Sequence, residues 1–502
     1  MLSAMEIPEI VDQVNQYLDI TDRLACIRVC KAWYHQFLPS IWEKIKPLPY
    51  SAHPLDNEPA NVKRHAHLIR EYSLRASIDA DHPLLSMHQL LSVHLSPHIL
   101  RTSSQETRDV QGQLLAMTII QNPSLESVHI EEYSVTSFAP FLQAVLESSS
   151  LQSLYMEQAL AYPSQMNESL FWKACSSLKV LEFDMKIPDS DIPSFGTDNQ
   201  LREVAFNRIK GLSPLRQLRL LAQCPRLKRL SWRLVERQEY PTEELSSLLC
   251  SGRWPDLESL EVNGARLSQE TLLQALALMP RGAAALSVSR SGFGPQAMVK
   301  LEQSLATIKT LELKLCDAVT SSMVQQILSS CPLLETFSAD ELSYIDMVDL
   351  GNDDGAFATP KNSWVCLGLK SFSVRITVWV PGMAYVRHDN EIVIQQLSRL
   401  SQIVSVDLSN KNRRLGPRPR DGKGEGLQFR THGGLKLLST WIQIRSLMFT
   451  DHQQMMGEEL RWILKNWRKI RRIHGPLNTH DQWTQWASGW FRQSGISLLP
   501  YQ

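Results

Sequence analysis

The 502-residue chain lacks the features that mark several large classes of protein. Lys plus Arg and Asp plus Glu both number 52, so the overall charge favours neither a nucleic-acid partner nor an anionic membrane. The most apolar stretch, 376–386, is interrupted by Pro381 and Gly382 and is too short to span a bilayer. The first residues carry neither the basic n-region nor the apolar h-region of a signal peptide. We therefore expect a soluble cytoplasmic or nuclear protein with no nucleic-acid or membrane partner.

A disulfide framework is also missing. The eight cysteines stand at positions 26, 30, 175, 224, 250, 316, 331 and 366, without the regular pairing of a secreted domain. This distribution indicates free, mostly buried thiols in a reducing compartment.

Motifs for catalysis or cofactor binding are absent as well. The segment 416–424 (GPRPRDGKG) has no Ser or Thr after its lysine and no strand-then-helix frame, so it does not fit a phosphate-binding loop. His65 with His67, and His94 with His98, have no Cys or carboxylate at ligand spacing, so surface histidines are the better interpretation. No nucleophile elbow, zinc-protease helix or kinase set is present. We predict no catalytic residue, no metal and no cofactor.

The first forty residues predict three short helices. Apolar residues recur from Ile7 to Leu18 at three- and four-residue steps, on a helix that Pro8 can open. Asp19 or Thr21 can cap a second helix, and a third helix would end at Pro39. So much apolar surface in so few residues predicts burial against a partner.

These residues resemble an F-box. The resemblance rests on Ile7-Pro8-Glu9-Ile10, Val14, Leu18 and Asp22, on the run from Val29 to Trp33 (Val-Cys-Lys-Ala-Trp), and on Ile41-Trp42. The family usually has a residue between the proline and the glutamate, which are adjacent here. The resemblance implies docking on a Skp-family adaptor and, through it, on a cullin ubiquitin ligase. The implied adaptor-binding residues are Ile7, Pro8, Ile10, Val14, Leu18, Val29 and Trp33. A three-helix start that packs on its own domain is the alternative.

A repeated pattern follows the prolines of 47–59. Each unit has an apolar residue, two variable residues, an apolar, one variable and an apolar. The fourteen units start at Ile69, Leu90, Leu125, Leu151, Leu178, Leu201, Leu227, Leu257, Ala283, Ile308, Leu334, Leu369, Ile403 and Ile444. Helical patterns such as 271–279, 298–305 and 323–328 lie between these starts. A strand and a helix about every 26 residues are typical of a leucine-rich repeat solenoid, an α/β fold with parallel strands on the concave face and helices outside.

The predicted domains are an F-box (1–46), a Pro-rich linker (47–64), the solenoid (65–475) and a C-terminal Trp-rich cap (476–502). Cys175, Cys224 and Cys331 stand where a cysteine-containing type of repeat, which often follows an F-box, ends its helix in the core. Insertions at 350–363 and 409–432 break the period; the second is basic, and either a binding loop or a solvated loop fits it. The row Trp483, Trp486 and Trp490 is interpreted as a cap, with a ligand-binding aromatic patch as the alternative.

Residues beside the inward apolar positions should face the concave surface. The early units place there His129, Glu131, Tyr155, Glu157, Glu182, Asp184 and Glu203, followed by Arg229, Arg233, Glu261 and Asn263. The predicted substrate-binding residues are Tyr155, Glu157, Glu182, Asp184, Arg229, Arg233 and Glu261. This face is acidic until Arg229, so we expect it to bind a basic segment of a substrate protein. A merely solvated face is the alternative.

The sequence therefore predicts a non-catalytic substrate receptor of a cullin ubiquitin ligase, in which an F-box holds a Skp-family adaptor and the repeats hold a protein substrate. The alternative is a repeat scaffold that acts without the ligase.

Overall fold

The computed structural model describes most of residues 7–499. The longer segments outside the description are 46–58, 75–81, 97–104, 234–242, 350–358, 379–387 and 410–425. Shorter breaks fall at 132–133, 136–137, 162–166, 186, 188–190, 196–198, 208, 210, 245–246, 249–253, 264–268, 270–271, 274–275, 277–282, 361, 450–452, 454 and 479–480. The chain divides into two compact units: unit 1 (residues 1–229 and 238–241) and unit 2 (residues 230–237 and 242–502).

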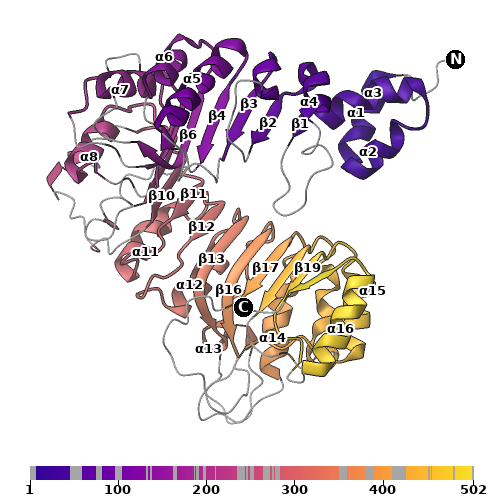
Figure 1. Cartoon of the computed structure of the whole chain (residues 1–502). Helices are drawn as coiled ribbons and strands as arrows, with labels where there is room; N and C mark the ends of the chain where they lie inside the picture. Colours follow the sequence, from indigo (N-terminus) through magenta and orange to yellow (C-terminus); the bar gives the residue numbers. More distant parts are fainter. Residues whose placement is uncertain are drawn as a thin grey trace. The chain divides into compact units, whose positions relative to one another are not determined.

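Unit 1 begins with three helices and continues as alternating strands and helices (Figure 1). Its strands are β1 (Lys44–Ile45), β2 (Glu71–Leu74), β3 (Ser92–Leu95), β4 (Ser127–Glu131), β5 (Ser134–Val135), β6 (Ser153–Ala161), β7 (Val180–Met185) and β8 (Glu203–Asn207). Its helices are α1 (Pro8–Tyr17), α2 (Ile20–Cys26), α3 (Lys31–Trp42), α4 (Pro59–Arg64), α5 (Gln105–Gln121), α6 (Ala139–Glu147), α7 (Glu168–Ser176) and α8 (Pro214–Ala222), with short 3₁₀ helices η2 (Ala66–Leu68) and η3 (Pro83–Ser86). Strands β1, β2, β3, β4, β6, β7 and β8 pair in parallel in that order.

Unit 2 repeats the same arrangement. Its strands are β9 (Arg229–Arg233), which starts on the last residue of unit 1, β10 (Ser259–Asn263), β11 (Ala285–Ser287), β12 (Thr310–Glu312), β13 (Thr336–Ser343), β14 (Val348–Asp349), β15 (Thr359–Pro360), β16 (Ser371–Thr377), β17 (Ser405–Leu408), β18 (Ser446–Phe449), β19 (Arg472–His474) and β20 (Ser497–Leu499). Its helices are α11 (Pro295–Leu301), α12 (Ser321–Ser330), α13 (Tyr344–Met347), α14 (His388–Ser398), α15 (Gly457–Asn466) and α16 (Asp481–Gln493), with 3₁₀ helices η6 (Glu302–Ser304), η7 (Thr431–Gly433) and η8 (Leu435–Thr440). β9 pairs with β10, and β10 to β13 and β16 to β20 pair in parallel; β14 and β15 form a separate antiparallel pair.

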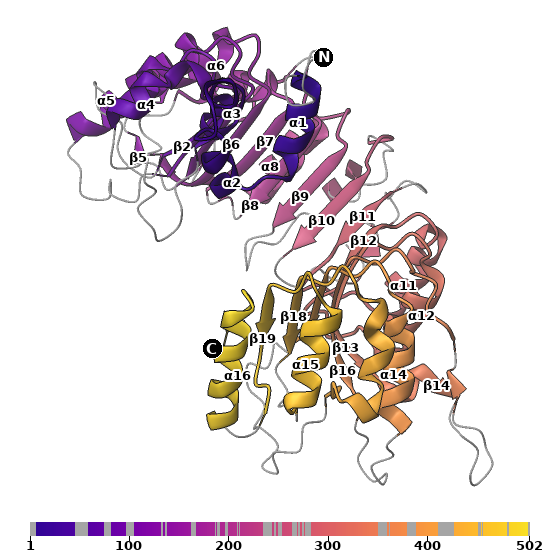
Figure 2. The same ribbon diagram turned by 90° about the vertical axis from the view of Figure 1, so that its right-hand side faces the viewer.

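The predicted fold class is confirmed: the chain is an α/β leucine-rich repeat solenoid. Each of the fourteen predicted repeat starts precedes a strand, and its apolar residues are buried except for the half-buried Leu74; Leu125, Val128 and Ile130 are at most 1% exposed. In each unit the described repeat helices cover one face of the sheet (Figures 1 and 2). We call the opposite sheet face the open face.

The buried cysteines lie where the repeat pattern places them. Cys175, Cys224 and Cys331 are fully buried at the ends of α7, α8 and α12. Burial raises the pKa of Cys224 and Cys331 to about 12, so both thiols are neutral packing groups. At the start of α12, the hydroxyl of Thr320 accepts a hydrogen bond from the Met323 N–H (3.3 Å), as the sequence predicts for a cap.

Two features of the structure differ from the sequence pattern. The prediction that Pro39 ends the third helix is wrong, because α3 continues through Pro39 to Trp42. Ile41 and Trp42 are 5% and 6% exposed, and their burial outweighs the hydrogen bond that the proline removes. The pattern also misses strands β1, β19 and β20, which are two or three residues long. The domain limits themselves stay predictions; most of the linker 47–64 and of the two insertions lies outside the described residues, as does most of the predicted helix 271–279.

Candidate functional site

The first three helices share a small core and leave most of their other apolar surface exposed. Val11, Phe37, Ile41 and Trp42 are buried. The Asp19 carboxylate accepts a hydrogen bond from the Asp22 N–H (2.9 Å), so Asp19 caps α2 as expected. Helix α2 itself contains no buried residue. A helix this short gains little stability without packing, so its exposed apolar side is available to a partner.

The structure separates the predicted adaptor-binding residues by exposure. Ile7 and Val29 are 37% and 62% exposed. Ile10, Val14, Leu18 and Trp33 are partly buried, and the side chain of Pro8 is outside the described residues. The Trp33 ring lies 5.7 Å from the ring of Phe37, so Trp33 also packs on the core of these helices.

Sequence reasoning missed four exposed apolar residues in the same helices. They are Tyr17, Ile20, Leu24 and Tyr34, with exposed fractions of 88%, 44%, 37% and 37%. Together with Ile7 and Val29 they form what we call the docking face. The amphipathic pattern of the second helix signalled an apolar side, but not whether that side stays exposed.

The docking helices are joined directly to the repeats. The Arg23 guanidinium donates to the backbone carbonyls of Asn15 (2.8 Å) and Ser40 (3.3 Å), which ties α2 to α1 and α3. Immediately after α3, strand β1 pairs in parallel with β2, with Lys44 opposite Glu71. These contacts attach the three helices to β1, the first strand of the sheet in unit 1.

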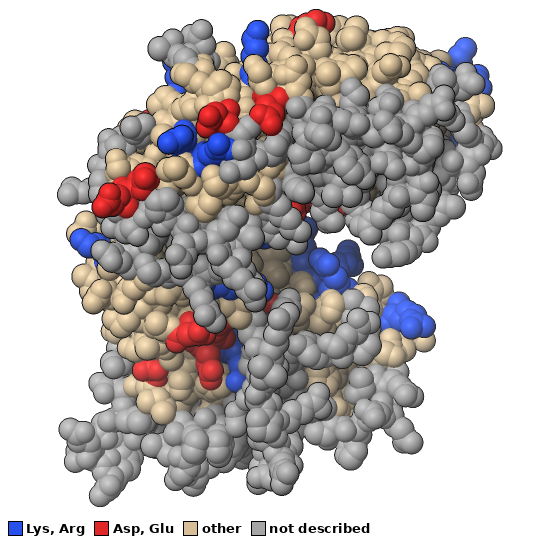
Figure 3. Space-filling view, turned by 60° about the vertical axis from the view of Figure 1, so that its left-hand side comes forward, with Lys and Arg blue, Asp and Glu red and all other residues tan. Residues whose placement is uncertain are grey.

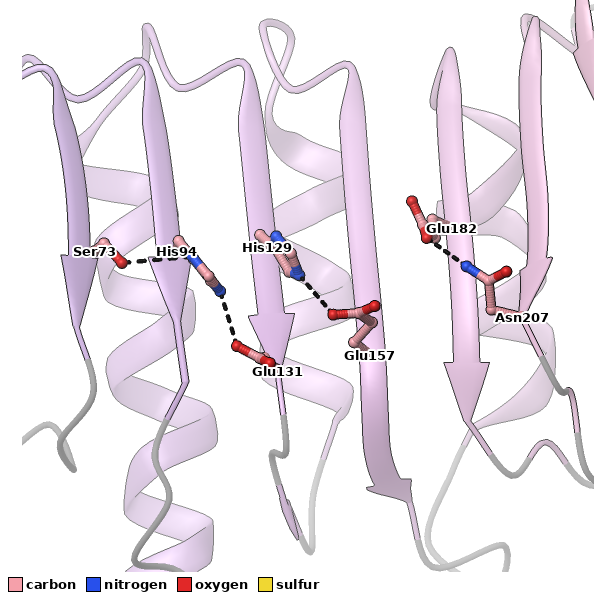
Figure 4. A network of polar contacts seen from close by, with 7 residues as sticks. All are labelled: Ser73, His94, His129, Glu131, Glu157, Glu182 and Asn207. Atoms are coloured by element: carbon pink, nitrogen blue, oxygen red, sulfur yellow. Dashed lines mark hydrogen bonds and ion pairs between the residues drawn. The ribbon is translucent and has the colours of Figure 1, made fainter. Parts of the chain in front are cut away.

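A row of polar and aromatic side chains crosses the open face of unit 1 (Figure 4). Consecutive strands place Ser73, His94, His129, Tyr155 and Glu182 at the same register position. The rings of His94 and His129 stack with centroids 4.1 Å apart, and the His129 and Tyr155 centroids are 5.6 Å apart. Close ring contacts of this kind fix the side-chain positions before any ligand arrives.

A second row, two residues further along each strand, is acidic. Glu131, Glu157 and Asp184 occupy matching positions on β4, β6 and β7. Each histidine points its Nε2 at the carboxylate of the next strand, as Figure 4 shows: the distance from His94 to Glu131 is 3.3 Å, and that from His129 to Glu157 is 3.6 Å. The two rows form one surface, which we call the unit 1 acidic face.

The electrostatics of the unit 1 acidic face favour cations. Burial, followed by the charge of His94, lowers the pKa of His129 to about 4, so this imidazole is neutral at pH 7. Burial and the nearby carboxylates of Glu203 and Glu182 raise the pKa of Tyr155. His129 therefore does not cancel the negative charge of the second row. On the surface drawn in Figure 3, acidic and basic residues form small neighbouring groups and no broad field of one sign.

The remaining predicted substrate-binding residues lie beyond this face. The Arg229 guanidinium lies 3.5 Å from the Glu203 carboxylate. The first basic residue of the predicted set therefore forms an ion pair with the last acidic residue before it. Arg233 and Glu261 belong to unit 2, where Arg233 is exposed and Glu261 accepts a hydrogen bond from the Ser231 hydroxyl (2.7 Å). The structure thus brings Tyr155, Glu157, Glu182 and Asp184 together on unit 1. It assigns Arg233 and Glu261 to unit 2.

Sequence reasoning missed Ser73, His94 and Asn207 at the unit 1 acidic face. The Ser73 hydroxyl is 3.4 Å from Nδ1 of His94, and the Asn207 amide donates to the Glu182 carboxylate (2.5 Å). His94 stands at the same repeat position as His129, which was the available signal. Among the described residues, no three His, Cys, Asp or Glu side chains converge as metal ligands do. None of the helices in that part of the chain has the length and apolar character needed to cross a bilayer.

No family model and no curated protein sequence matches the chain. Among solved structures, it is similar to one described as the crystal structure of the Rad7 and Elc1 complex in yeast, with a TM-score of 0.41 and 10% sequence identity. The match covers 98% of this chain and 95% of that chain. A similarity at this identity and TM-score extends along both chains and supports no conclusion about activity or partners.

Proposed function

We propose that the chain is a non-catalytic substrate receptor of an SCF-type cullin ubiquitin ligase. The docking helices would bind a Skp-family adaptor, and the unit 1 acidic face would bind a basic segment of the substrate. Catalysis would come from proximity, because a bound substrate presents its lysines at high local concentration to ubiquitin that the cullin brings in.

The observation that carries this proposal is the exposure of helix α2. It has no buried residue, and Ile20 and Leu24 stay in contact with solvent, as do Ile7 and Val29. A solvated apolar helix costs free energy that docking would recover, at about 0.8 kcal/mol for each CH₂ group buried. The alternative, a helical start that only packs on its own chain, does not require these residues to be exposed.

Adaptor binding is tested with exposed residues, so that the fold is left intact. The wild-type chain, co-expressed with a Skp-family adaptor, should give a stable complex. Ile20→Ala with Leu24→Ala should weaken that complex by roughly 30-fold, because six carbon groups are lost from side chains that are 44% and 37% exposed, so docking would newly bury about 2 kcal/mol of them. The matched control is Ile120→Ala with Val299→Ala, two residues that are 63% and 61% exposed on α5 and α11. A wild-type chain that ignores the adaptor would eliminate the ligase role.

Partial packing makes other positions less informative. Leu18→Ala with Trp33→Ala is also expected to abolish the complex, but Trp33 packs on Phe37, so this pair of substitutions also perturbs the helices. Circular dichroism of each variant separates loss of docking from loss of the fold.

Substrate binding is tested on the unit 1 acidic face. Reversing Glu157, Glu182 and Asp184 to lysine should abolish capture of a protein that the wild-type chain captures, while adaptor binding is kept. The matched control reverses Glu302 and Glu335, two carboxylates of unit 2. Unchanged capture by the triple variant would remove the acidic face from the proposal.

The second candidate is a repeat scaffold without a ligase. In this candidate the first three helices either act only as a cap or bind the adaptor without a cullin. A pull-down with the full-length chain decides between them, because the receptor must bring down a cullin through the docking face and the scaffold must not.

A further inference from the structure

The last repeats of unit 2 carry an excess of exposed basic side chains. Their basic residues between 441 and 478 are Arg445, Arg461, Lys465, Arg468, Lys469, Arg471 and Arg472, and the acids are Asp451, Glu458 and Glu459. Glu459 is 4% exposed, and its carboxylate accepts hydrogen bonds from the Thr431 and Met456 N–H groups, so it does not face the bases. Glu458 stands at the opposite end of α15 from Lys465. Within the described part of the chain, no ion pair neutralises Arg468, Arg471 or Arg472.

The backbone gathers five of these bases, Arg445, Arg468, Lys469, Arg471 and Arg472, at one rim of the sheet. The N–H groups of Arg471 and Arg472 both donate to the Arg445 carbonyl, at 2.9 and 3.1 Å, so the starts of β18 and β19 are adjacent. The Lys469 ammonium donates to the side chain of Gln443 (2.6 Å) at the same rim. Arg472 is exposed on the open face, one residue before the buried Ile473. We call this group the basic rim.

An aromatic row lies next to the basic rim on the helix side. The Trp483 and Trp486 ring centroids are 6.0 Å apart, and those of Trp486 and Trp490 are 4.9 Å apart. Ala487 and Phe491 supply the buried side of α16, whereas Trp486 is 50% exposed. The predicted interpretation of this row as a sealing cap therefore does not account for its outward face.

Bases on α15 connect the basic rim with the aromatic row. The guanidinium carbon of Arg461 lies 5.8 Å from the centre of the Trp490 ring, and Figure 2 shows α15 and α16 side by side. Lys465 stands one helical turn after Arg461, toward Arg468. The bases therefore continue from the tryptophans on the helix layer to Arg472 on the open face.

This path around an edge decides the class of ligand. A flat bilayer cannot touch Trp486 on the helix layer and Arg472 on the open face together. A flexible polyanion can, and an exposed indole is a surface on which a base stacks. We propose that the basic rim and the aromatic row bind single-stranded nucleic acid, with phosphates on Arg468, Arg471 and Arg472 and a base on the exposed side of Trp486.

The balanced charge of the whole chain does not oppose this site. Lys plus Arg and Asp plus Glu are equal over 502 residues, but binding depends on the local field within about a Debye length, ~10 Å at 0.1 M salt. The site is in unit 2. Tests of nucleic-acid binding there are independent of tests of the docking face and of the unit 1 acidic face.

The test uses the full chain and fluorescence anisotropy with labelled 20-nucleotide oligo-dT and oligo-rU. Binding should weaken with salt at a log–log slope of about −2 to −4, as expected for three to six phosphate contacts at ~0.7 each. Arg468→Glu with Arg471→Glu and Arg472→Glu should reduce affinity at least 100-fold. Trp486→Ala should reduce it roughly tenfold and remove part of the tryptophan quenching that stacking causes. The matched control, Lys173→Glu with Lys300→Glu, should leave affinity unchanged.

Three results would overturn the proposal. One is no binding of either oligonucleotide by the folded wild-type chain. Another is binding that survives the triple reversal. The third is that poly-glutamate of equal charge, or vesicles with phosphatidylserine, bind as tightly as the oligonucleotides and are insensitive to Trp486→Ala, which would assign the surface to an acidic protein or a membrane.

Discussion

Replacing Asn122 by alanine should loosen the second repeat of unit 1. Asn122 follows α5 near the end of that repeat and is fully buried, as is Leu90, which starts the same repeat. The Asn122 side-chain carbonyl oxygen accepts the Leu90 N–H at 2.9 Å, and its amide donates to the Thr118 carbonyl at 2.8 Å. One side chain therefore connects the end of a helix with the backbone at the start of its own repeat.

The magnitude follows from what alanine leaves behind. The Leu90 N–H stays buried without its acceptor, which costs about 1–3 kcal/mol. The alanine methyl group also leaves unfilled space where the amide was, and this adds to the loss. We expect the free energy of unfolding of unit 1 to fall by about 2–3 kcal/mol.

Hydrogen exchange measured at the Leu90 amide is the direct assay, with urea denaturation as the global one. A loss of about 2 kcal/mol corresponds to roughly thirtyfold faster exchange if the amide opens locally. Asn466→Ala is the control, because the Asn466 amide donates only to the Trp462 carbonyl of its own helix (2.8 Å). If the Leu90 amide exchanges at the wild-type rate in Asn122→Ala, the Asn122 side chain does not hold the two ends of the repeat together.

Three further predictions concern stability. The pKa of His129 is about 4 in the folded chain and 6.5 in the unfolded chain, so the unfolded state binds more protons between these pH values. The free energy of unfolding should be highest above pH 6.5 and fall by about 1–2 kcal/mol toward pH 4. In urea denaturation at a series of pH values, His129→Phe should remove this fall. Trp441→Phe removes the indole N–H that donates to the buried Leu397 carbonyl (3.0 Å), and we expect a loss of about 1–3 kcal/mol in urea denaturation, with Trp462→Phe, which removes no such bond, as the comparison. Gly475 has φ of +133°, and an added Cβ would lie 2.2 Å from the Phe449 carbonyl oxygen, so Gly475→Ala should lower the melting temperature of unit 2 by several degrees; an unchanged melting temperature would contradict the close approach.

The period of apolar residues was enough to predict the repeat strands, because each strand buries two side chains in the core and these side chains are apolar at regular positions in the sequence. Strands β1 and β19 were missed for a physical reason: where the pattern needs its third apolar residue, β1 is followed by Pro47 and β19 by Gly475. Pro39 misled the prediction because the rule for proline describes a local cost, whereas the burial of Trp42 is a tertiary gain.

The candidate sites divide in the same way. Repeat position alone identified His129, Tyr155 and Glu157 as neighbours, since equal positions in a parallel sheet must meet. The ring stack of His94 on His129 depends on side-chain rotation, which the spacing does not determine. Exposure of Ile20 and Leu24 could not be predicted either, because an amphipathic helix shows which face is apolar and not whether the chain itself covers it.

Pairing of β1 with β2 has a mechanical consequence. A helical module connected by a flexible loop would reorient freely. Here the residues after α3 form the first strand of the sheet, so the three helices move only together with the sheet. Within unit 1, the docking face and the acidic face are thus held at a set span. For the substrate receptor proposed above, a substrate bound on that sheet would lie at a fixed distance from the ubiquitin-transferring enzyme. Which lysine is modified would then depend on its position along the substrate.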